Sequence, residues 1–239
     1  MYKPRNYRRS MAPEGLVSFE VMEAETDLAI SADKDLSSVA RQAITNYRRD
    51  IEGYIKKDPR FFSSLEPIDV VGDSPLIIKA MAEASRKAGV GPMASVAGAV
   101  AEFVGTELLK YSKQVIIENG GDIFMHSLTP RIVGVYAGEY SPFKNKLAIR
   151  VDSPGKNIGV CTSSGTVSHS LSFGKSDAAL LISSDAALAD AAATTVGNIV
   201  KNKADIEKGI DVARSIPGID GVLIVIGDKM GSWGKIELV

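Results

Sequence analysis

A carboxylate inside a run of small residues constrains the fold of this chain more than any other feature of its sequence. The run covers residues 184–197, consists largely of small residues, and holds Asp190 deep within it. We interpret the run as a helix. An ionised carboxylate among Ala, Leu and Val side chains is costly unless it is paired or holds a cation. The chain must therefore bring a partner to Asp190.

Two kinds of partner fit Asp190. Thr194 lies one turn further along the helix, so its hydroxyl shares a face with the carboxylate. Two hard oxygen ligands among small Ala side chains could form half of a Mg²⁺ or Ca²⁺ site. Alternatively, Asp190 caps a neighbouring loop by accepting hydrogen bonds from its backbone, and isolated buried acids are more often structural than catalytic. The spacing alone favours the capping role.

Composition limits the classes of protein to which the chain can belong. Its 239 residues are 45% apolar and 24% charged, as in an ordinary globular protein, and we expect a single domain over residues 1–239. The formal net charge of −1 gives no reason to expect a nucleic acid or an anionic membrane as a partner. We interpret the basic N-terminal run as a solvated or subunit-contacting arm, which comprises Lys3, Arg5, Arg8 and Arg9.

Membrane and disulfide signals are absent from the sequence. No apolar run reaches the length of a membrane span, and the basic start is not followed by the apolar segment of a signal peptide. Cys161 is the single cysteine, which excludes an internal disulfide and a Cys-rich zinc site. A reducing cytoplasm is therefore the expected location.

Hydrophobic periodicity predicts an α+β chain. Alternation predicts a strand pair within 14–32, and later strands at 114–118, 131–137, 146–152, 157–162, 179–183, 221–226 and 235–239. Helical spacing predicts helices at 35–57, 76–88, 184–197 and 204–214, and a further helix through 103–108. Ser74 is the expected N-cap of the second helix, with Pro75 in its first turn. No repeat or linker marks a domain boundary.

Three further segments offer binding chemistry. Residues 89–101 are almost wholly small, which indicates a packing seam or a binding surface. Gly120 and Gly121 follow a strand, so they form a tight turn by default and could also present amides to a polar ligand. Residues 163–177 form a hydroxyl-rich loop.

The order of four motifs resembles the family of ApbE flavin transferases, first described as thiamine-biosynthesis lipoproteins. They are Ala-Ser-Val-Ala-Gly-Ala-Val-Ala (94–101), Glu-Asn-Gly-Gly-Asp-Ile (118–123), Ser-Ser-Gly…Ser-His (163–169) and Ala-Asp-Ala-Ala-Ala-Thr (189–194). The resemblance covers roughly residues 90–200. It implies a single ApbE-like, T-fold-related unit in which a mixed or antiparallel sheet is packed by helices.

The resemblance also implies a reaction. Family members bind FAD and use Mg²⁺ to cleave its pyrophosphate, transferring FMN to a Thr or Ser of an acceptor protein. By family resemblance, Mg²⁺ is held by Asp190, Thr194 and the carbonyl of Ala97, and His169 is the candidate general base. The nucleotide-binding residues that the resemblance implies are Asn119, Gly120, Gly121, Asp122, Ser164 and Gly165.

The chain departs from the family pattern at two motifs. Gly98 stands where the family has a phosphate-facing lysine, and Lys175 is a candidate to supply the lost charge. The family's Asp-Pro-Arg-Thr-Gly is replaced by residues 172–177, and the lipoprotein signal is missing. The resemblance is therefore to a cytosolic branch associated with anaerobes and with sulfur assimilation into homocysteine. A non-catalytic nucleotide-binding or accessory protein is the alternative to a transferase.

Two residues have competing interpretations, and the oligomeric state is a separate expectation. Cys161 is expected to be buried and inert, because no basic residue adjoins it in sequence. Trp233 could stack on a flavin ring, although a packing role is the more common one for an aromatic in a terminal turn. We expect a homodimer that uses the basic arm or the small-residue seam at 89–101.

Overall fold

The structure is a computed structural model and describes residues 13–138, 141–143, 146–165 and 174–239. Its α-helices are α1 (Ser37–Lys57), α2 (Arg60–Ser63), α3 (Leu76–Ala88), α4 (Val96–Leu108), α5 (Ala186–Ile199) and α6 (Ile206–Ser215). Two short 3₁₀ helices, η2 (Pro92–Ser95) and η3 (Lys203–Asp205), precede α4 and α6.

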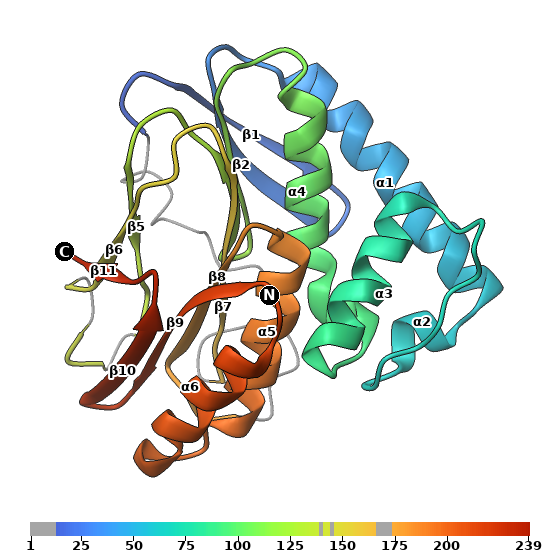
Figure 1. The fold of residues 1–239 in the computed structure, drawn as a ribbon. Helices are drawn as coiled ribbons and strands as arrows, with labels where there is room; N and C mark the ends of the chain where they lie inside the picture. Colours follow the sequence, from blue (N-terminus) through green and yellow to red (C-terminus); the bar gives the residue numbers. More distant parts are fainter. Residues whose placement is uncertain (1–12, 139–140, 144–145, 166–173) are drawn as a thin grey trace.

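The strands form two antiparallel sheets (Figure 1). The larger sheet has the order β1-β2-β3-β4-β7-β8-β9-β10, formed by Val17–Glu23, Thr26–Ala32, Val115–Asn119, Asp122–His126, Asn157–Ser163, Ala178–Ser183, Ile219–Ile226 and Lys229–Gly234. The smaller sheet has the order β11-β6-β5, formed by Glu237–Leu238, Ala148–Val151 and Arg131–Gly134. Every described pairing is antiparallel, which confirms the predicted α+β class with its helix-packed sheet.

Two hydrophobic cores lie on opposite faces of the large sheet. Helices α1, α3, α4, α5 and α6 pack on one face, and the small sheet packs on the other (Figure 1). Strand β8 is buried along its whole length because it contributes Leu181 to the helical core and Leu180 to the core between the sheets. A continuous apolar run is what a strand covered on both faces requires.

A tight hairpin joins β3 to β4 and projects toward the start of α4. Asn119 pairs with Asp122, and the two residues between them, Gly120 and Gly121, have φ angles of 71° and 107°. Two consecutive positive φ angles suit a two-residue hairpin turn and favour Gly at both positions. The default expectation of a tight turn is therefore met, and the turn places the side chains of Asn119 and Asp122 beside α4 and β7.

Three local expectations need correction. Ser74 does not cap α3: Pro75 occupies the N-cap position, and among the described residues the buried Ser74 hydroxyl has no hydrogen-bond partner. Strand β4 follows the Gly-Gly turn where none was predicted, although Phe124 fills the core there. The predicted strand at 235–239 is only β11, because Gly234 with φ 77° ends β10 and the chain then crosses to the small sheet.

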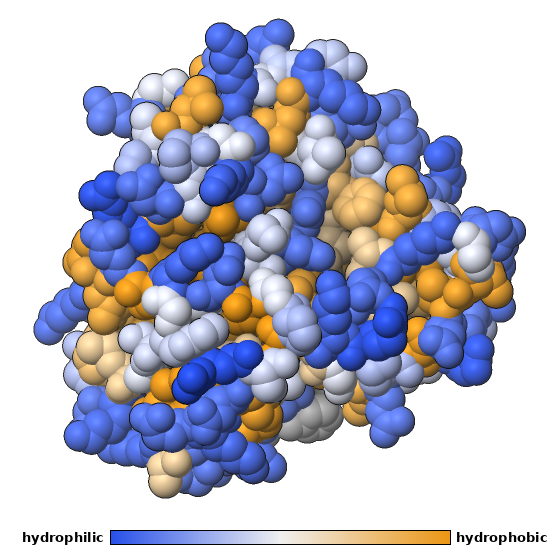
Figure 2. Space-filling model, in the orientation of Figure 1, coloured by the Kyte–Doolittle hydropathy of each residue, from blue (hydrophilic) through white to orange (hydrophobic). Residues whose placement is uncertain are grey.

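The surface shows no single dominant apolar region on the face in Figure 2, where apolar residues are dispersed among hydrophilic ones. Within the described residues, no single helix has the length and apolar character needed to span a membrane. The helix pair formed by 76–88 and 92–108 meets that test only when joined across a bend of 103°.

Candidate functional site

Asp190 on α5 caps the start of α4. Its Oδ2 accepts a hydrogen bond from the Gly98 amide at 2.9 Å, and the Ala97 amide is also directed at the carboxylate. Ala97 and Gly98 lie in the first turn of α4, where amides have no partner within the helix. The N-cap residue itself, Ser95, makes no side-chain cap bond. Asp190 therefore supplies the missing acceptor from 92 residues away.

The reverse arrangement holds at the start of α5. Glu102, one turn beyond Gly98 on α4, accepts a hydrogen bond at Oε2 from the Ala186 amide at 2.7 Å and also interacts with the Ala187 amide. Asp185 completes this cap by accepting from the Leu188 amide at 2.8 Å. Moving four residues forward on α4 means moving four back on α5, so the helices run antiparallel where they cross. Each helix thus caps the other.

Glycines allow the two helices to approach this closely. A Cβ added at Gly98 would lie 2.2 Å from the carbonyl oxygen of Ala186 and 2.9 Å from the Asp190 Cβ. On the other side of α5, a Cβ at Gly159 of β7 would lie 2.4 Å from the Cα of Ala186. Position 98 therefore has no room for a side chain in this structure, which accounts for glycine in place of the lysine of the family pattern.

The β3–β4 turn closes the site beside these helices. Asn119 Nδ2 donates to the carbonyl oxygen of Ala97 at 3.0 Å. Asp122 is buried, and its Oδ1 accepts from the Thr162 amide of β7 at 3.1 Å. Asp122 also acts electrostatically on Asp190, so the two carboxylates share one neighbourhood. Four segments therefore bring the site together: the first turn of α4, the middle of α5, the β3–β4 turn and the end of β7.

The electrostatics of the site disfavour negative charge. Loss of solvation, and then the nearby Asp122 carboxylate, raise the pKa of Asp190 well above its ordinary value, although the Gly98 and Ala97 amides oppose the shift. Burial, and then Asp185, raise the pKa of Glu102 to about 7. Both effects follow from placing carboxylates near one another where water solvates them poorly.

The same surroundings enclose Cys161, which is fully buried. Burial, and then Asp122 and Asp190, raise the pKa of the Cys161 thiol. Its Sγ donates to the Ala186 carbonyl at 3.4 Å, so the thiol packs against the start of α5. A raised pKa disfavours the reactive thiolate, which agrees with the expected buried and inert role.

A cation would relieve the repulsion between the carboxylates. Asp190 and Asp122 provide carboxylate oxygens, the Ala97 carbonyl lies at the same helix end, and Thr194 follows one turn along α5. Hard oxygen donors of this kind suit Mg²⁺, which commonly keeps several water ligands. Within the described part of the chain, no three His, Cys, Asp or Glu side chains gather into a metal cluster. The donor set fits an ion whose remaining ligands come from water or substrate.

The structure describes the surroundings of some of the other predicted site residues but not of all of them. His169 lies outside the described residues. The Gly121 amide donates to Glu118 Oε1 at 2.7 Å. Ser164 is buried near the end of β7, and the Gly165 amide donates to the Ser176 carbonyl at 3.0 Å. This backbone bond ties the end of β7 to the approach to β8.

The structure places the backbone of Lys175 beside a predicted nucleotide-binding residue and places Trp233 away from the site. A Cβ added at Gly165 would lie 3.1 Å from the Lys175 backbone nitrogen. The Lys175 amide bonds to the carbonyl of Val200 at the far end of α5, roughly 15 Å along the helix axis from Asp190. Trp233 lies on β10, three strands away from β7, with the Arg214 guanidinium 5.6 Å from its ring centre. Trp233 therefore has the packing role.

The small-residue seam at 89–101 packs largely inside the molecule. A Cβ added at Gly91 would lie 1.8 Å from the carbonyl oxygen of Ser64, just as one at Gly98 would meet Ala186. Val100 and Ala101 are buried in the helical core. The small residues of the seam thus serve contacts between segments of this chain.

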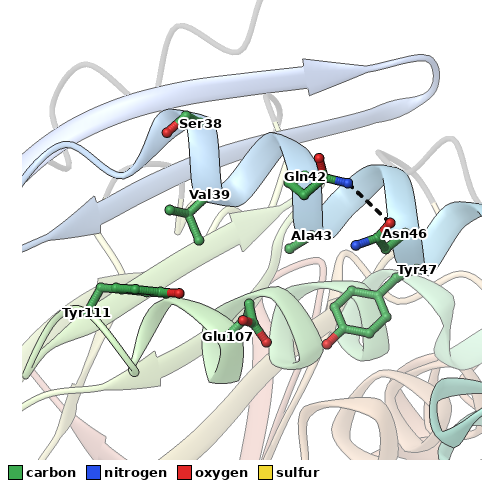
Figure 3. A pocket seen from close by; sticks show the side chains of 8 residues that line it. All are labelled: Ser38, Val39, Gln42, Ala43, Asn46, Tyr47, Glu107 and Tyr111. Atoms are coloured by element: carbon green, nitrogen blue, oxygen red, sulfur yellow. Dashed lines mark hydrogen bonds between the residues drawn. The ribbon is translucent and has the colours of Figure 1, made fainter.

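A hollow lies at the other end of α4 (Figure 3). This groove has a volume of about 450 Å³ and separates α1 from the last turn of α4. Its lining residues are Ser38, Val39, Gln42, Ala43, Asn46, Tyr47, Glu107 and Tyr111. Glu107 is already paired with Lys110 at 2.7 Å, and Gln42 donates to Asn46 at 3.2 Å. These pairings make the groove a weaker candidate than the site between α4 and α5.

Comparison with known proteins agrees with this fold. The helix-packed antiparallel sheet is that of the ApbE-like class, and the solved structures that match include the flavin transferase ApbE from Vibrio cholerae. The two chains share 13% identity with a TM-score of 0.61, over 93% of this chain and 98% of the other. The ApbE protein from Thermotoga maritima matches with 14% identity and a TM-score of 0.58, over 90% and 96% of the two chains. At these identities the likeness establishes the fold alone.

The family follows from sequence comparison. The model of a family described as AbpE bacteria matches residues 8–216, and the chain belongs to this family. A UPF0280 protein from Methanocella arvoryzae is 42% identical over 216 residues, which cover 90% of this chain and 87% of the relative. A UPF0280 protein from Methanocaldococcus jannaschii is also 42% identical, over 222 residues and 90% of each chain.

Proposed function

We propose that this protein is a Mg²⁺-dependent transferase that cleaves FAD and transfers FMN to a Thr or Ser of an acceptor protein. The observation that carries the proposal is the convergence of Asp190, Asp122 and the Ala97 carbonyl at the start of α4. Carboxylates brought together at the expense of their solvation are typical of functional sites. The family and the fold make flavin nucleotide the ligand to test first.

The proposed metal ligands are Asp190, Thr194 and the carbonyl oxygen of Ala97. A bound Mg²⁺ would supply neutralisation of the pyrophosphate oxygens and of the charge on the departing phosphate. Asn119 holds the Ala97 carbonyl through its 3.0 Å hydrogen bond and so fixes the direction of that ligand. Because Asp190 already occupies amides in the first turn of α4, those amides are not offered to the phosphate directly.

The remaining residues act on the nucleotide and on the proton. Those proposed to bind the nucleotide are Asn119, Gly120, Gly121, Asp122, Ser164 and Gly165. The acceptor hydroxyl oxygen forms a bond to the phosphorus on the FMN side, the P–O–P bond breaks, and AMP leaves with the electron pair. His169 is proposed to take the hydroxyl proton as general base.

The direct test is incubation of the purified protein with FAD and Mg²⁺, with release of AMP followed by chromatography. We expect FMN and AMP from hydrolysis, or covalent FMN on a Ser or Thr when an acceptor is present. Asp190→Asn should keep the shape of the side chain but abolish Mg²⁺-dependent nucleotide binding. Asp185→Asn, which preserves a helix cap outside the proposed ligand set, is the matched control. Nucleotide binding that ignores both Mg²⁺ and Asp190→Asn would contradict the proposal.

One observation favours the alternative of a non-catalytic nucleotide-binding or accessory protein, for which the resemblance suggests sulfur assimilation into homocysteine. Position 98 is closed by backbone atoms, and Lys175 is tied to the far end of α5. Position 98 therefore supplies no cation to face phosphate, unlike the lysine of the family pattern. Tight FAD binding without release of AMP would support the accessory role, and absence of FAD binding would remove flavin from both.

A further inference from the structure

We propose that Glu102 is a positioning residue that fixes the register of α5 against α4 and thereby holds Asp190 in the candidate site. The functional part of this inference rests on the proposed function, whereas its structural part does not. Glu102 lies outside the four motifs that carry the resemblance to the ApbE family. Its carboxylate instead bonds the amides of Ala186 and Ala187 at the start of α5.

The contacts that α5 makes with α4 and β7 divide into two kinds. The glycine contacts, at Gly98 and Gly159, bring backbone atoms together and set how closely α5 approaches its neighbours. Such contacts set separation but resist sliding along the helix axis only weakly, because they involve small groups. The bond of 2.7 Å from the Ala186 amide to Glu102 is directional. A slide of one residue, about 1.5 Å, would take a hydrogen bond of this length outside its normal range.

The same slide would move Asp190 away from its place. Ala186 and Asp190 are four residues apart and so share one face of α5, as Gly98 and Glu102 share one face of α4. The hydrogen bonds from Ala186 to Glu102 and from Gly98 to Asp190 thus link the same two helices at two points. If the bond to Glu102 is lost, the bond to Asp190 alone holds the register of α5 against α4.

The location of Glu102 is costly, which supports a specific role. Its carboxylate is buried enough for its pKa to rise, and Asp185 lies near enough to add to the shift. Burying an ionisable group seldom adds net stability, and its best-attested use is to select one register among several. A local residue could accept hydrogen bonds from the Ala186 and Ala187 amides at a lower desolvation cost, as Asp185 does for the Leu188 amide.

Hydrogen exchange at the Gly98 amide tests the structural part without any ligand. This amide donates to Asp190, so its protection reports whether Asp190 is in place. We expect Glu102→Ala to lower the protection of Gly98 at least tenfold relative to Val222, a buried residue of β9, which is paired on both sides by β8 and β10. Glu102→Gln keeps one acceptor oxygen and should restore most of the protection. Asp185→Ala is the control because it removes a cap from the same helix while leaving both hydrogen bonds between α4 and α5 in place.

Nucleotide titration in the presence of Mg²⁺ then tests the functional part. We expect Glu102→Ala to weaken Mg²⁺-dependent FAD binding at least fivefold, while Asp185→Ala changes it by less than twofold at a comparable loss of melting temperature. Equal losses of affinity in the two variants would overturn the positioning role, as would unchanged Gly98 protection in Glu102→Ala. If the wild-type protein binds no FAD, the proposed function fails, and Gly98 protection still decides whether Glu102 sets the register.

Discussion

The two ends of α4 carry carboxylates in opposite circumstances. At its start, Asp190 arrives from α5, accepts backbone amides beside a second carboxylate, and has a raised pKa. In its last turn, Glu107 pairs with Lys110 at 2.7 Å beside the groove along α1, where Lys110 is largely exposed to solvent. The groove is the more obvious hollow, but its charge is already matched by a neighbour three residues away. The candidate site is therefore the place where two carboxylates lie close together with poor solvation, and not the groove along α1.

The largest expected effect concerns the close approach at the start of α4. Gly98→Ala places a Cβ 2.2 Å from the Ala186 carbonyl oxygen, so backbone must move, and we expect a loss of about 3 kcal/mol or more in the free energy of unfolding. Gly98→Lys, which installs the family's lysine, should be at least as destabilising. Urea denaturation measures both effects.

Gly53→Ala in α1 is the matched control for these substitutions. Gly53 lies inside a helix with nothing within 4 Å of an added Cβ, so Ala should stabilise the protein by about 0.5–1 kcal/mol. A Gly98→Ala variant as stable as the wild type would mean that α4 and α5 are not in close backbone contact at Gly98.

The second expected effect is a pH dependence of stability that originates at the α4–α5 contact. The pKa of Glu102 rises from an ordinary 4.5 to about 7 on folding, so between these values the folded protein holds a proton that the unfolded chain has released. Stability conferred by that proton is fully present below pH 4.5 and is lost as pH rises to about 7, to an extent on the order of 2–3 kcal/mol. The raised pKa of Asp190 acts in the same direction.

Glu102→Gln removes this titration while keeping an acceptor for the Ala186 amide. The difference in unfolding free energy between the variant and the wild type should therefore change between pH 4.5 and 7. As pH rises through this range, the unfolding free energy of the wild type should fall relative to that of the variant. Denaturation curves collected across that window test the expectation. A difference that stays constant with pH would show that Glu102 does not titrate there.

The sequence predicted the main elements because their patterns are local. The predicted helix 76–88 coincides with α3, where Gly89 adopts the left-handed conformation expected at a helix end. Strand β4 was missed because only its pairing with β3 and β7 reveals it, and the short stretch 122–126 follows a turn motif directly. Ser74 was misjudged because the signal for an N-cap does not include the tertiary contacts that bury its hydroxyl.

The candidate site was partly predictable for a related reason. Asp190 stood out as a charge among small residues, and the four motifs marked the turns and helices around it. Glu102 carries the same signal, a lone acid directly after the small-residue run that contains Gly98, but it belonged to no predicted ligand set. Its partner is an amide 84 residues away, which no local pattern can reveal. Both capping roles depend on how α4 and α5 cross, so only the fold makes them visible.

Two adjacent threonines on α5 allow a further comparison, between a hydroxyl with a structural role and a hydroxyl proposed as a metal ligand. Thr195 Oγ1 donates to the Ala88 carbonyl at 2.7 Å and so ties α5 to the end of α3. Thr195→Val should therefore lower the free energy of unfolding by about 1 kcal/mol and leave Mg²⁺-dependent nucleotide binding intact. Thr194→Val should do the reverse, with weaker nucleotide binding and little change in stability. Calorimetric titration and thermal denaturation of both variants separate the two roles, and identical behaviour would argue against Thr194 as a ligand.

The smallest expected effect is at the far end of α4, where Glu107→Gln removes the ion pair with Lys110. The two residues are three apart on the surface of the helix end, and the Lys110 side chain is 60% exposed, so water already solvates much of the pair. Exposed pairs of this kind contribute about 0.2–1 kcal/mol, and salt reduces the contribution. We expect a loss of about 0.5 kcal/mol at low ionic strength that shrinks at high salt, measured by urea denaturation. A loss several times larger would show that Glu107 is coupled to the groove along α1 as strongly as Glu102 is to α5, and the contrast between the two ends of α4 would no longer hold.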